Sequence, residues 1–129
     1  MTQEDKNLLL KDLCGRLPYG VKISVNDNIE SLQGISALDN VADYGLFLAS
    51  DIEEVKPYLF PISSMTEKQK EEYRKVCELD TEILSKHPMD GTPFPAMHNS
   101  QDWLDANHFD YRGLIPMGLA NDATGLNIY

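Results

Sequence analysis

Val21-Lys22-Ile23-Ser24-Val25 is the stretch of this sequence that decides its fold class. Apolar and polar side chains alternate strictly along it, which is typical of a β-strand with one buried face. Asn26-Asp27-Asn28 follows directly and predicts a turn, because Asn and Asp tolerate left-handed backbone conformations and bond their own backbone. The sequence therefore predicts a sheet, with its clearest strand at residues 21–25.

Three later segments extend the predicted sheet. Residues 29–35 alternate less cleanly between apolar and polar side chains. Residues 44–49 are a continuous apolar run, which favours a central strand buried on both faces. Residues 55–62 indicate a further strand, which Pro57 and Pro61 assign to an edge of the sheet. We expect a small antiparallel sheet or an open barrel of three to four strands.

Helical patterns flank this sheet on both sides. Apolar residues at helical spacing predict an N-terminal helix over residues 3–14, which Gly15 ends. Thr66-Glu67-Lys68-Gln69 has the form of a capping box and opens one long helix over residues 67–86. The apolar stripe of that helix consists of Tyr73, Val76, Cys77, Leu79, Ile83 and Leu84.

The last third of the chain is expected to be less regular. Three prolines and a glycine make residues 88–98 an extended Pro-rich connector. Ser100 then caps a short C-terminal helix that ends near Asn107, and an irregular tail follows. We name residues 99–129 the C-terminal clasp segment, because we expect it to fasten the tail to the rest of one α+β domain, residues 1–129. Its tail packs either in cis or onto a neighbouring copy.

Composition limits the partners that this chain can bind. The 129 residues, 42% hydrophobic and 25% charged, fit one globular domain. The net charge of -10 comes from 21 acidic and 11 basic residues that are spread evenly along the chain. Nucleic acids and anionic membrane surfaces attract clustered Lys and Arg, so both are disfavoured as direct partners.

Cysteine content and the N-terminus bear on location. Cys14 and Cys77 lie far apart, without a CxxC spacing, on the apolar sides of the two longer predicted helices. We expect two buried thiols in a reducing cytoplasm, with a disulfide as the alternative. No segment resembles a signal peptide or is long enough to span a bilayer, so the predicted location is cytoplasmic.

Residues 103–114 hold the densest chemistry in the chain. They include the single tryptophan, a histidine, two further aromatic residues and an arginine. Aromatic residues and arginine dominate binding hot spots. The candidate binding residues are therefore Trp103, His108, Phe109, Tyr111 and Arg112. The alternative is that the aromatic side chains pin the tail to the domain as ordinary core.

Histidines and carboxylates near this segment offer an enzymatic alternative. A metal site or an acid–base site would use His98, Asp102, Asp105, His108 and Asp110. Helical spacing could bring these residues together in pairs, but the order fits no familiar ligand pattern. No nucleophile elbow or Gly-rich phosphate loop is present either. We therefore assign no catalytic residue, no metal ligand and no cofactor.

Asp80 is unusual because it falls within the apolar stripe of the long predicted helix. A carboxylate in such a place needs a partner or takes a raised pKa. The functional interpretation is a tuned acid. The structural one is a position at the solvent edge of the stripe, or an ion pair, for which Arg112 is the candidate because the tail holds no other base.

Three segments, residues 17–21, 56–66 and 108–115, carry a resemblance. With Leu17-Pro18-Tyr19-Gly20-Val21, Lys56-Pro57-Tyr58-Leu59-Phe60 and His108-Phe109-Asp110-Tyr111-Arg112 among them, the chain resembles a group of small uncharacterised bacterial proteins. That group is abundant in gut anaerobes and linked to prophages and other mobile elements, and it tends to have a basic residue where this chain has Phe60. The resemblance implies an accessory or regulatory protein rather than a metabolic enzyme.

Three functions follow from these observations. The leading hypothesis is a non-enzymatic accessory or regulatory protein that binds another protein. The alternative is a small metal-dependent or acid–base enzyme that uses His98, His108 and nearby carboxylates. The third is an acidic mimic of nucleic acid, which requires one continuous stripe of carboxylates.

Overall fold

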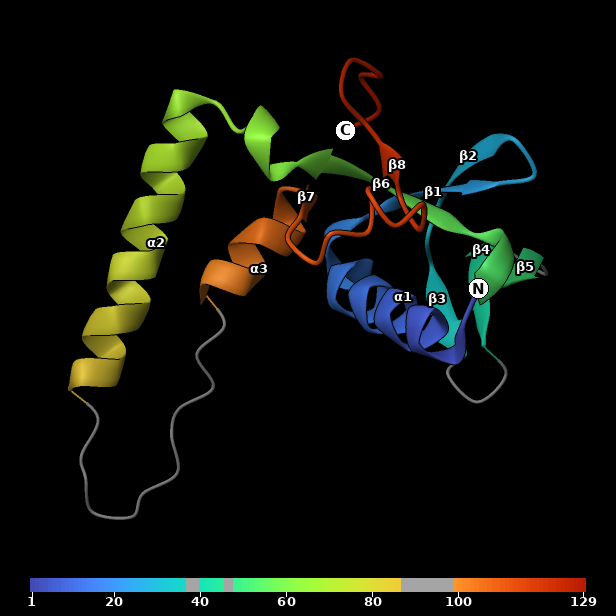
Figure 1. The fold of residues 1–129 in the computed structure, drawn as a ribbon, viewed down its shortest axis with the longest axis horizontal. Helices are drawn as coiled ribbons and strands as arrows, with labels where there is room; N and C mark the ends of the chain where they lie inside the picture. Colours follow the sequence, from blue (N-terminus) through green and yellow to red (C-terminus); the bar gives the residue numbers. More distant parts are fainter. Residues whose placement is uncertain (37–39, 46–47, 87–98) are drawn as a thin grey trace, which may run out of the picture.

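Three helices and two sheets make up the part of the chain that the computed structural model describes, residues 1–36, 40–45, 48–86 and 99–129. The predicted α+β class is confirmed (Figure 1). The helices are α1 (Gln3–Arg16), α2 (Glu67–Ser85) and α3 (Asn99–Ala106). The strands are β1 (Lys22–Val25), β2 (Asn28–Ser31), β3 (Gly34–Ser36), β4 (Val41–Gly45), β5 (Leu48–Asp51), β6 (Lys56–Pro61), β7 (Phe109–Asp110) and β8 (Asn121–Asp122).

The strand that decides the fold class forms as predicted. β1 pairs with β2 as an antiparallel hairpin in which Val25 lies opposite Asn28. Asn26 and Asp27 have positive φ values of 49° and 64°, as a tight hairpin turn between twisted strands requires. Val21, Ile23 and Val25 are buried, so the alternation in the sequence is the alternation of burial.

β6 lies inside its sheet, so the prediction of an edge strand is wrong. It pairs with β1 in antiparallel fashion and with β7 and β8 in parallel fashion. Its prolines do not prevent this, because other residues make the connecting bonds. The Phe60 N–H donates to the His108 carbonyl, and the Leu59 carbonyl accepts from the Ala123 N–H. The resulting sheet has five strands and mixes both orientations.

The described part of the predicted central strand 44–49, residues 44, 45, 48 and 49, does not form a buried central strand, and residues 46 and 47 lie outside the described residues. The segment contributes to two short strands, β4 and β5, which pair antiparallel with Gly45 opposite Leu48. A Cβ on Gly45 would come within 3.0 Å of the Leu48 side chain, so glycine permits this close approach. β3, β4 and β5 form a separate three-stranded sheet in which Leu48 is exposed. Apolar composition alone did not distinguish an exposed edge from a core.

α1 begins as expected but ends later. Thr2 and Asp5 form a reciprocal capping box at its start. The helix continues through Gly15, so the prediction that this residue ends it is wrong. A Cβ at Gly15 would lie 3.2 Å from Asp105 Oδ2 of α3, so the glycine lets the two helices approach closely. Cys14 is exposed and Cys77 half-buried, which contradicts the expected burial of both thiols.

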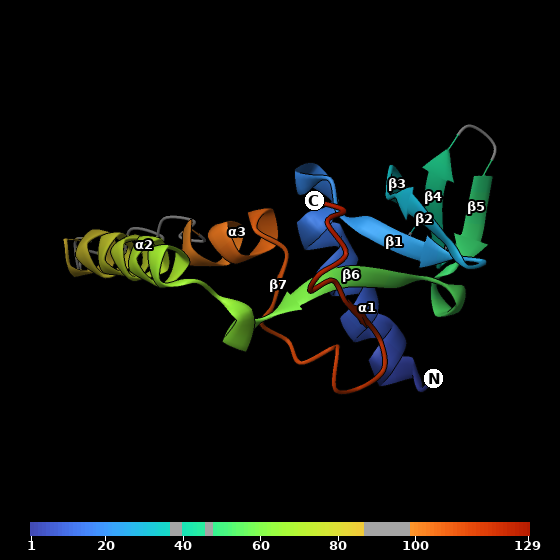
Figure 2. The same ribbon diagram turned by 90° about the horizontal axis from the view of Figure 1, so that it is seen from above.

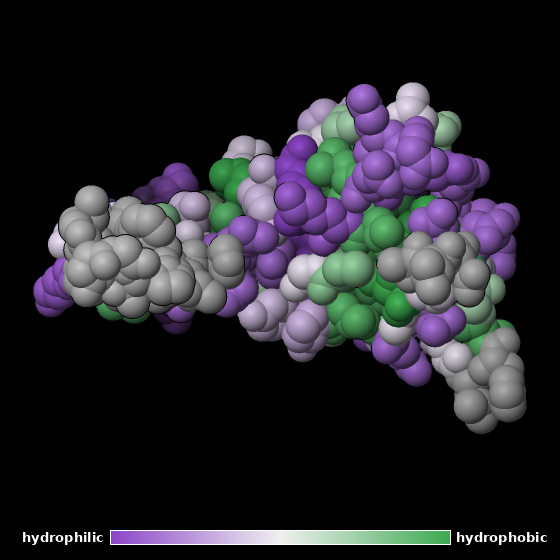
Figure 3. All heavy atoms as spheres, turned by 90° about the horizontal axis from the view of Figure 1, so that it is seen from below, coloured by the Kyte–Doolittle hydropathy of each residue, from purple (hydrophilic) through white to green (hydrophobic). Residues whose placement is uncertain are grey.

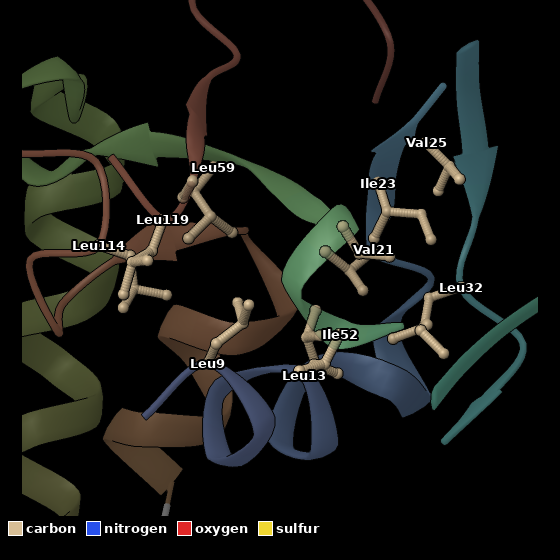
Figure 4. Packing of buried hydrophobic residues seen from close by; sticks show 13 residues of the cluster. Leu9, Leu13, Val21, Ile23, Val25, Leu32, Ile52, Leu59, Leu114 and Leu119 are labelled. Atoms are coloured by element: carbon tan, nitrogen blue, oxygen red, sulfur yellow. The ribbon is translucent and has the colours of Figure 1, made fainter. Parts of the chain in front are cut away.

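The main core lies between α1 and the two sheets. Leu9 and Leu13 of α1 point toward Val21, Ile52 and the other buried side chains of the cluster (Figure 4). Leu114 and Leu119 of the tail close the same cluster. The tail of the clasp segment therefore contributes to the main core. We call α1, the two sheets and the tail the body of the molecule.

α2 is an arm that projects from the body. Figures 1 and 2 both show α2 to one side of the molecule, with α3 between it and the body. The predicted capping box is confirmed, since the Thr66 N–H donates to Gln69 Oε1 and the Gln69 N–H donates to Thr66 Oγ1. None of the α2 side chains that the structure describes is buried. No helix among the described residues is long and apolar enough to cross a membrane.

Candidate functional site

A buried ion network joins α1 to the clasp segment. Asp12 and Arg16, one helical turn apart on α1, are both 0% exposed. Arg16 Nε donates to Asp12 Oδ2 at 2.8 Å, and Arg16 Nη2 donates to the Phe109 carbonyl at 2.6 Å. The guanidinium of α1 thus holds the backbone of β7.

Arg112 completes the network from the tail side. Its Nη1 donates to Asp12 Oδ1 at 2.8 Å and to the Tyr111 hydroxyl at 2.8 Å. Its guanidinium also lies 4.6 Å from the centre of the Tyr111 ring, within cation–π distance. The suggested pairing of Arg112 with Asp80 is wrong, because Arg112 pairs with the buried Asp12, and Asp80 bonds Ser100 instead.

Asp105 is the second carboxylate of the network. It accepts a hydrogen bond from the Tyr111 hydroxyl at 2.8 Å, and Arg16 Nη1 lies 3.9 Å from its Oδ1. Burial raises the pKa of Asp105. Burial and the adjacent Asp105 raise the pKa of Tyr111 to about 12, so its hydroxyl stays protonated and donates at neutral pH. Two carboxylates and two guanidiniums balance in charge, as a buried network requires.

The histidines do not converge on a metal or acid–base site among the described residues. His108 is buried in a left-handed conformation, with φ of 63°, and its Nδ1 has no hydrogen-bond partner. Burial, helped by the charge of Arg16, lowers its pKa to about 4, so the ring is neutral. His98 lies outside the described residues. Within them, no group of three or more His, Cys, Asp or Glu residues is placed to hold a metal ion.

The other carboxylates named from the sequence have separate positions. Asp110 accepts from the Leu114 and Ile115 N–H groups and so shapes the turn after β7. Asp102 is exposed on α3. Asp80 Oδ2 accepts from the Ser100 N–H at 2.9 Å, and hydrogen bonding to Ser100 lowers the pKa of Asp80. Asp80 therefore ties α2 to the first turn of α3.

Aromatic side chains fill the junction between arm and body. Trp103 stacks on Phe109 at 5.7 Å with ring planes 9° apart, and its other neighbour is Tyr73 of α2 at 5.5 Å. Phe109 is 1% exposed, whereas Trp103 and Tyr111 are half-buried. His108 stacks on Tyr129 at 3.6 Å. Of the five candidate binding residues, Phe109 and His108 are thus enclosed within the chain itself.

Sequence reasoning missed Asp12 and Arg16, although a signal was present. Leu9, Asp12, Leu13 and Arg16 recur at the i, i+3, i+4, i+7 spacing of one helical face. All four are 0% exposed. A charged pair inside an apolar stripe indicates a buried ion pair, and it also identifies the side of α1 that faces the core.

Two of the surface cavities that the described residues form bear on the search for a site. One is lined by Lys6, Asn40, Asp51, Ile52 and Glu53, where Lys6 and Glu53 form an ion pair. The other has a volume of about 250 Å³ and lies where β6, the start of α2 and the tail meet. The second cavity borders the aromatic junction through Phe109.

Comparison of the chain with protein-family models, with curated proteins and with solved structures gives no match. The described residues combine a buried ion network inside the body, an exposed helical arm, and an aromatic junction between them.

Proposed function

We propose that this chain is a non-enzymatic accessory or regulatory protein that binds another protein through its arm, α2. The observation that carries the proposal is that a helix of 19 residues buries none of the side chains described in it. Most helices in globular proteins gain their stability from a buried apolar face. A helix that is held by α3 on one side and exposed on the other is suited to recognition by a partner.

Local interactions give α2 that rigidity. Its capping box satisfies the first turn, and ion pairs follow along its outer side: Glu67 with Lys70, Arg74 with Glu71 and Glu78, and Glu82 with Lys86. Each such pair contributes only a few tenths of a kcal/mol, but together they favour the helical state. Leu79, 48% exposed, gives this charged surface an apolar contact point.

The proposal moves the expected contact surface from the clasp segment to α2. Phe109 and His108 are buried, so a partner cannot reach them without unfolding the junction. Trp103 and Tyr111 are half-buried and lie in the junction that supports α2. We therefore assign these aromatic residues to holding the arm, and the partner surface to α2.

The enzymatic alternative has less support. Of the two histidines that this alternative uses, the structure describes His108. That side chain is neutral, buried and stacked on Tyr129 rather than paired with a carboxylate. Asp105 Oδ1 accepts from the Tyr111 hydroxyl, and both carboxylate oxygens of Asp110 accept from backbone N–H groups. An acid–base site needs groups that can reach a substrate proton.

The acidic-mimic hypothesis is also weaker than protein binding. Acidic and basic side chains alternate along α2 and pair with one another, so they do not form a single stripe of one sign. On the face of the molecule shown in Figure 3, hydrophobic residues interrupt the hydrophilic surface of the body. The cytoplasmic location and the link to mobile elements remain predictions.

A matched pair of variants tests this proposal. Leu79 on α2 and Leu48 on β5 are 48% and 50% exposed, so Leu79→Glu and Leu48→Glu make the same change at two places. Tagged wild type and both variants, each shown to be folded by circular dichroism, are used to capture proteins from a native lysate. We expect at least one protein to be lost with Leu79→Glu and kept with Leu48→Glu, and the purified protein to capture this chain in return.

The opposite result is equally clear. If wild type and both variants retain the same proteins in equal amounts, α2 is not the partner surface.

A further inference from the structure

One side of α2 carries a line of three exposed side chains. Glu72, Leu79 and Lys86 recur at a spacing of seven residues, which places them almost in one line along a helix. All three are exposed. Lys86 continues the last turn of α2, because its N–H donates to the Glu82 carbonyl. We call Glu72, Leu79 and Lys86 the heptad line.

The heptad line lies away from the contacts between α2 and α3. Those contacts are made by Tyr73, whose ring lies 5.5 Å from that of Trp103, and by Asp80, which accepts from the Ser100 N–H. A helix turns by about 100° per residue, so Tyr73 and Asp80 lie about 100–120° around the axis from Leu79. Figures 1 and 2 show α2 at one end of the molecule. The heptad line is therefore open to a second molecule.

The charges on the heptad line have opposite signs on the two sides of Leu79. Glu72 lies seven positions before Leu79 and Lys86 seven positions after it, which is about 10 Å along the axis in each direction. Glu72 forms no ion pair among the described residues. The Lys86 side chain is 73% exposed, and its partner in the described part of the chain is Glu82 on the same helix. Both charges can therefore take a partner from another molecule.

We propose that α2 pairs in antiparallel fashion with α2 of a second copy of this chain, with Leu79 packed against Leu79 of the second copy. Residues at equal distances from the centre of an antiparallel pair face each other, so Glu72 of each copy lies opposite Lys86 of the other. Lys75 lies within one position of Glu82 of the other copy. Both attractive contacts occur twice, because the pair is two-fold symmetric.

The charges also select the orientation of the pair. A parallel pair would place Glu72 opposite Glu72 and Lys86 opposite Lys86, and such like-charge contacts disfavour a complex. Charges beside an apolar contact set the orientation of paired helices in the same way. A contact along one helix is smaller than the roughly 1,200–2,000 Å² of a stable interface, so the pair forms weakly and at high concentration.

The inference rests on the proposed function, because both assign recognition to α2, but the two can fail separately. The purified chain alone tests for a second copy, whereas lysate capture tests for a different protein. If the purified chain stays monomeric and Leu79→Glu still loses a lysate protein, this inference is overturned and the proposed function stands. If the chain pairs but no lysate protein depends on Leu79, the inference stands and the proposed function fails.

Reversal of the charges tests the pairing. Sedimentation equilibrium gives the dissociation constants of wild type, Glu72→Lys, Lys86→Glu and the double variant, each shown to be folded by circular dichroism. Each single reversal replaces attraction by repulsion at two symmetric places, so we expect it to weaken the pair by about tenfold or more. The double variant brings opposite charges together again, and we expect its dissociation constant to return toward that of wild type.

Lys70→Glu is the matched control for Lys86→Glu, because it changes the net charge by the same amount. Lys70 is nine positions from Leu79, which places it on the opposite side of the helix. We expect Lys70→Glu to pair like wild type. The proposal is overturned if wild type does not associate at about 1 mM, or if Lys70→Glu weakens the pair as much as Lys86→Glu. It is also overturned if the single reversals have no effect or the double variant regains no affinity.

Discussion

The ion network of the body and the ion pairs of the arm use the same chemistry in opposite surroundings. In the body, Asp12 and Arg16 are 0% exposed and hydrogen-bonded to groups far away in the sequence. On the arm, Arg74 and its partners Glu71 and Glu78 keep about half or more of their side-chain surface exposed. The buried charges of the body connect distant segments of the fold, whereas the exposed charges of the arm pair only with neighbours on the same helix.

The energetic consequence follows from solvation. An exposed pair exchanges contacts with water for contacts with each other, so its net contribution is about 0–1 kcal/mol. A buried pair has lost its water, and removal of one partner leaves the other charge without compensation. Arg–carboxylate pairs therefore contribute strongly to the tertiary structure in the body, and they contribute little to it on the arm.

The largest expected effect is at Asp12. Asp12→Ala leaves Arg16 buried without its ionic partner and removes the anchor of Arg112, so we expect the free energy of unfolding to fall by about 3–5 kcal/mol. Urea denaturation followed by circular dichroism measures the loss. A loss below about 1 kcal/mol would contradict the role that we assign to the network.

The second largest expected effect is a pH dependence of the free energy of unfolding, which arises from His108 in the body. His108 has a pKa of about 4 in the folded state and near 6.5 in the unfolded state, so the unfolded state binds more protons between these values. Stability is therefore complete above pH 6.5 and falls as the pH drops toward 4. The loss is at most about 3 kcal/mol, from the 1.36 kcal/mol that each pKa unit represents.

His108→Asn isolates this histidine from the other titrating groups. Asn also tolerates the positive φ at this position, so the backbone is preserved. The raised pKa of Asp105 acts in the opposite direction, because the folded state then binds its proton more tightly. The free energy of unfolding of wild type minus that of His108→Asn should therefore decrease steadily from pH 7 to pH 4. A constant difference would show that His108 does not titrate in this way.

The smallest effect is expected on the arm. Arg74→Ala breaks the pairs with Glu71 and Glu78 but exposes no buried charge, so the free energy of unfolding should change by less than about 0.5 kcal/mol. Added salt should reduce even this difference, since screening weakens exposed pairs. Thermal unfolding at low and high salt provides the measurement. A loss of unfolding free energy as large as that of Asp12→Ala would contradict the distinction between buried and exposed ion pairs.

The sequence predicted those elements whose structure depends on residues a few positions apart. The alternation at residues 21–25, the turn at Asn26 and Asp27, and the capping box at Thr66 each appear in the structure where the sequence places them. Failures occurred where a neighbour decides the outcome. Residues 55–62 are central because β7 and β8 return to pair with β6, and no pattern within the segment shows those partners.

The candidate site was predictable as a location but not as a set of roles. The many aromatic and charged side chains of residues 103–114 pointed to this segment, and its aromatic residues do lie between arm and body. The sequence by itself determined the α+β class, the hairpin and the starts of α1 and α2, because hydrogen bonding and side-chain period act over a few residues. Only the tertiary structure decided that Arg112 meets Asp12, that burial keeps His108 neutral and that α2 packs against α3 with its outer side exposed. Those outcomes depend on burial, and burial depends on which distant segments share the same space.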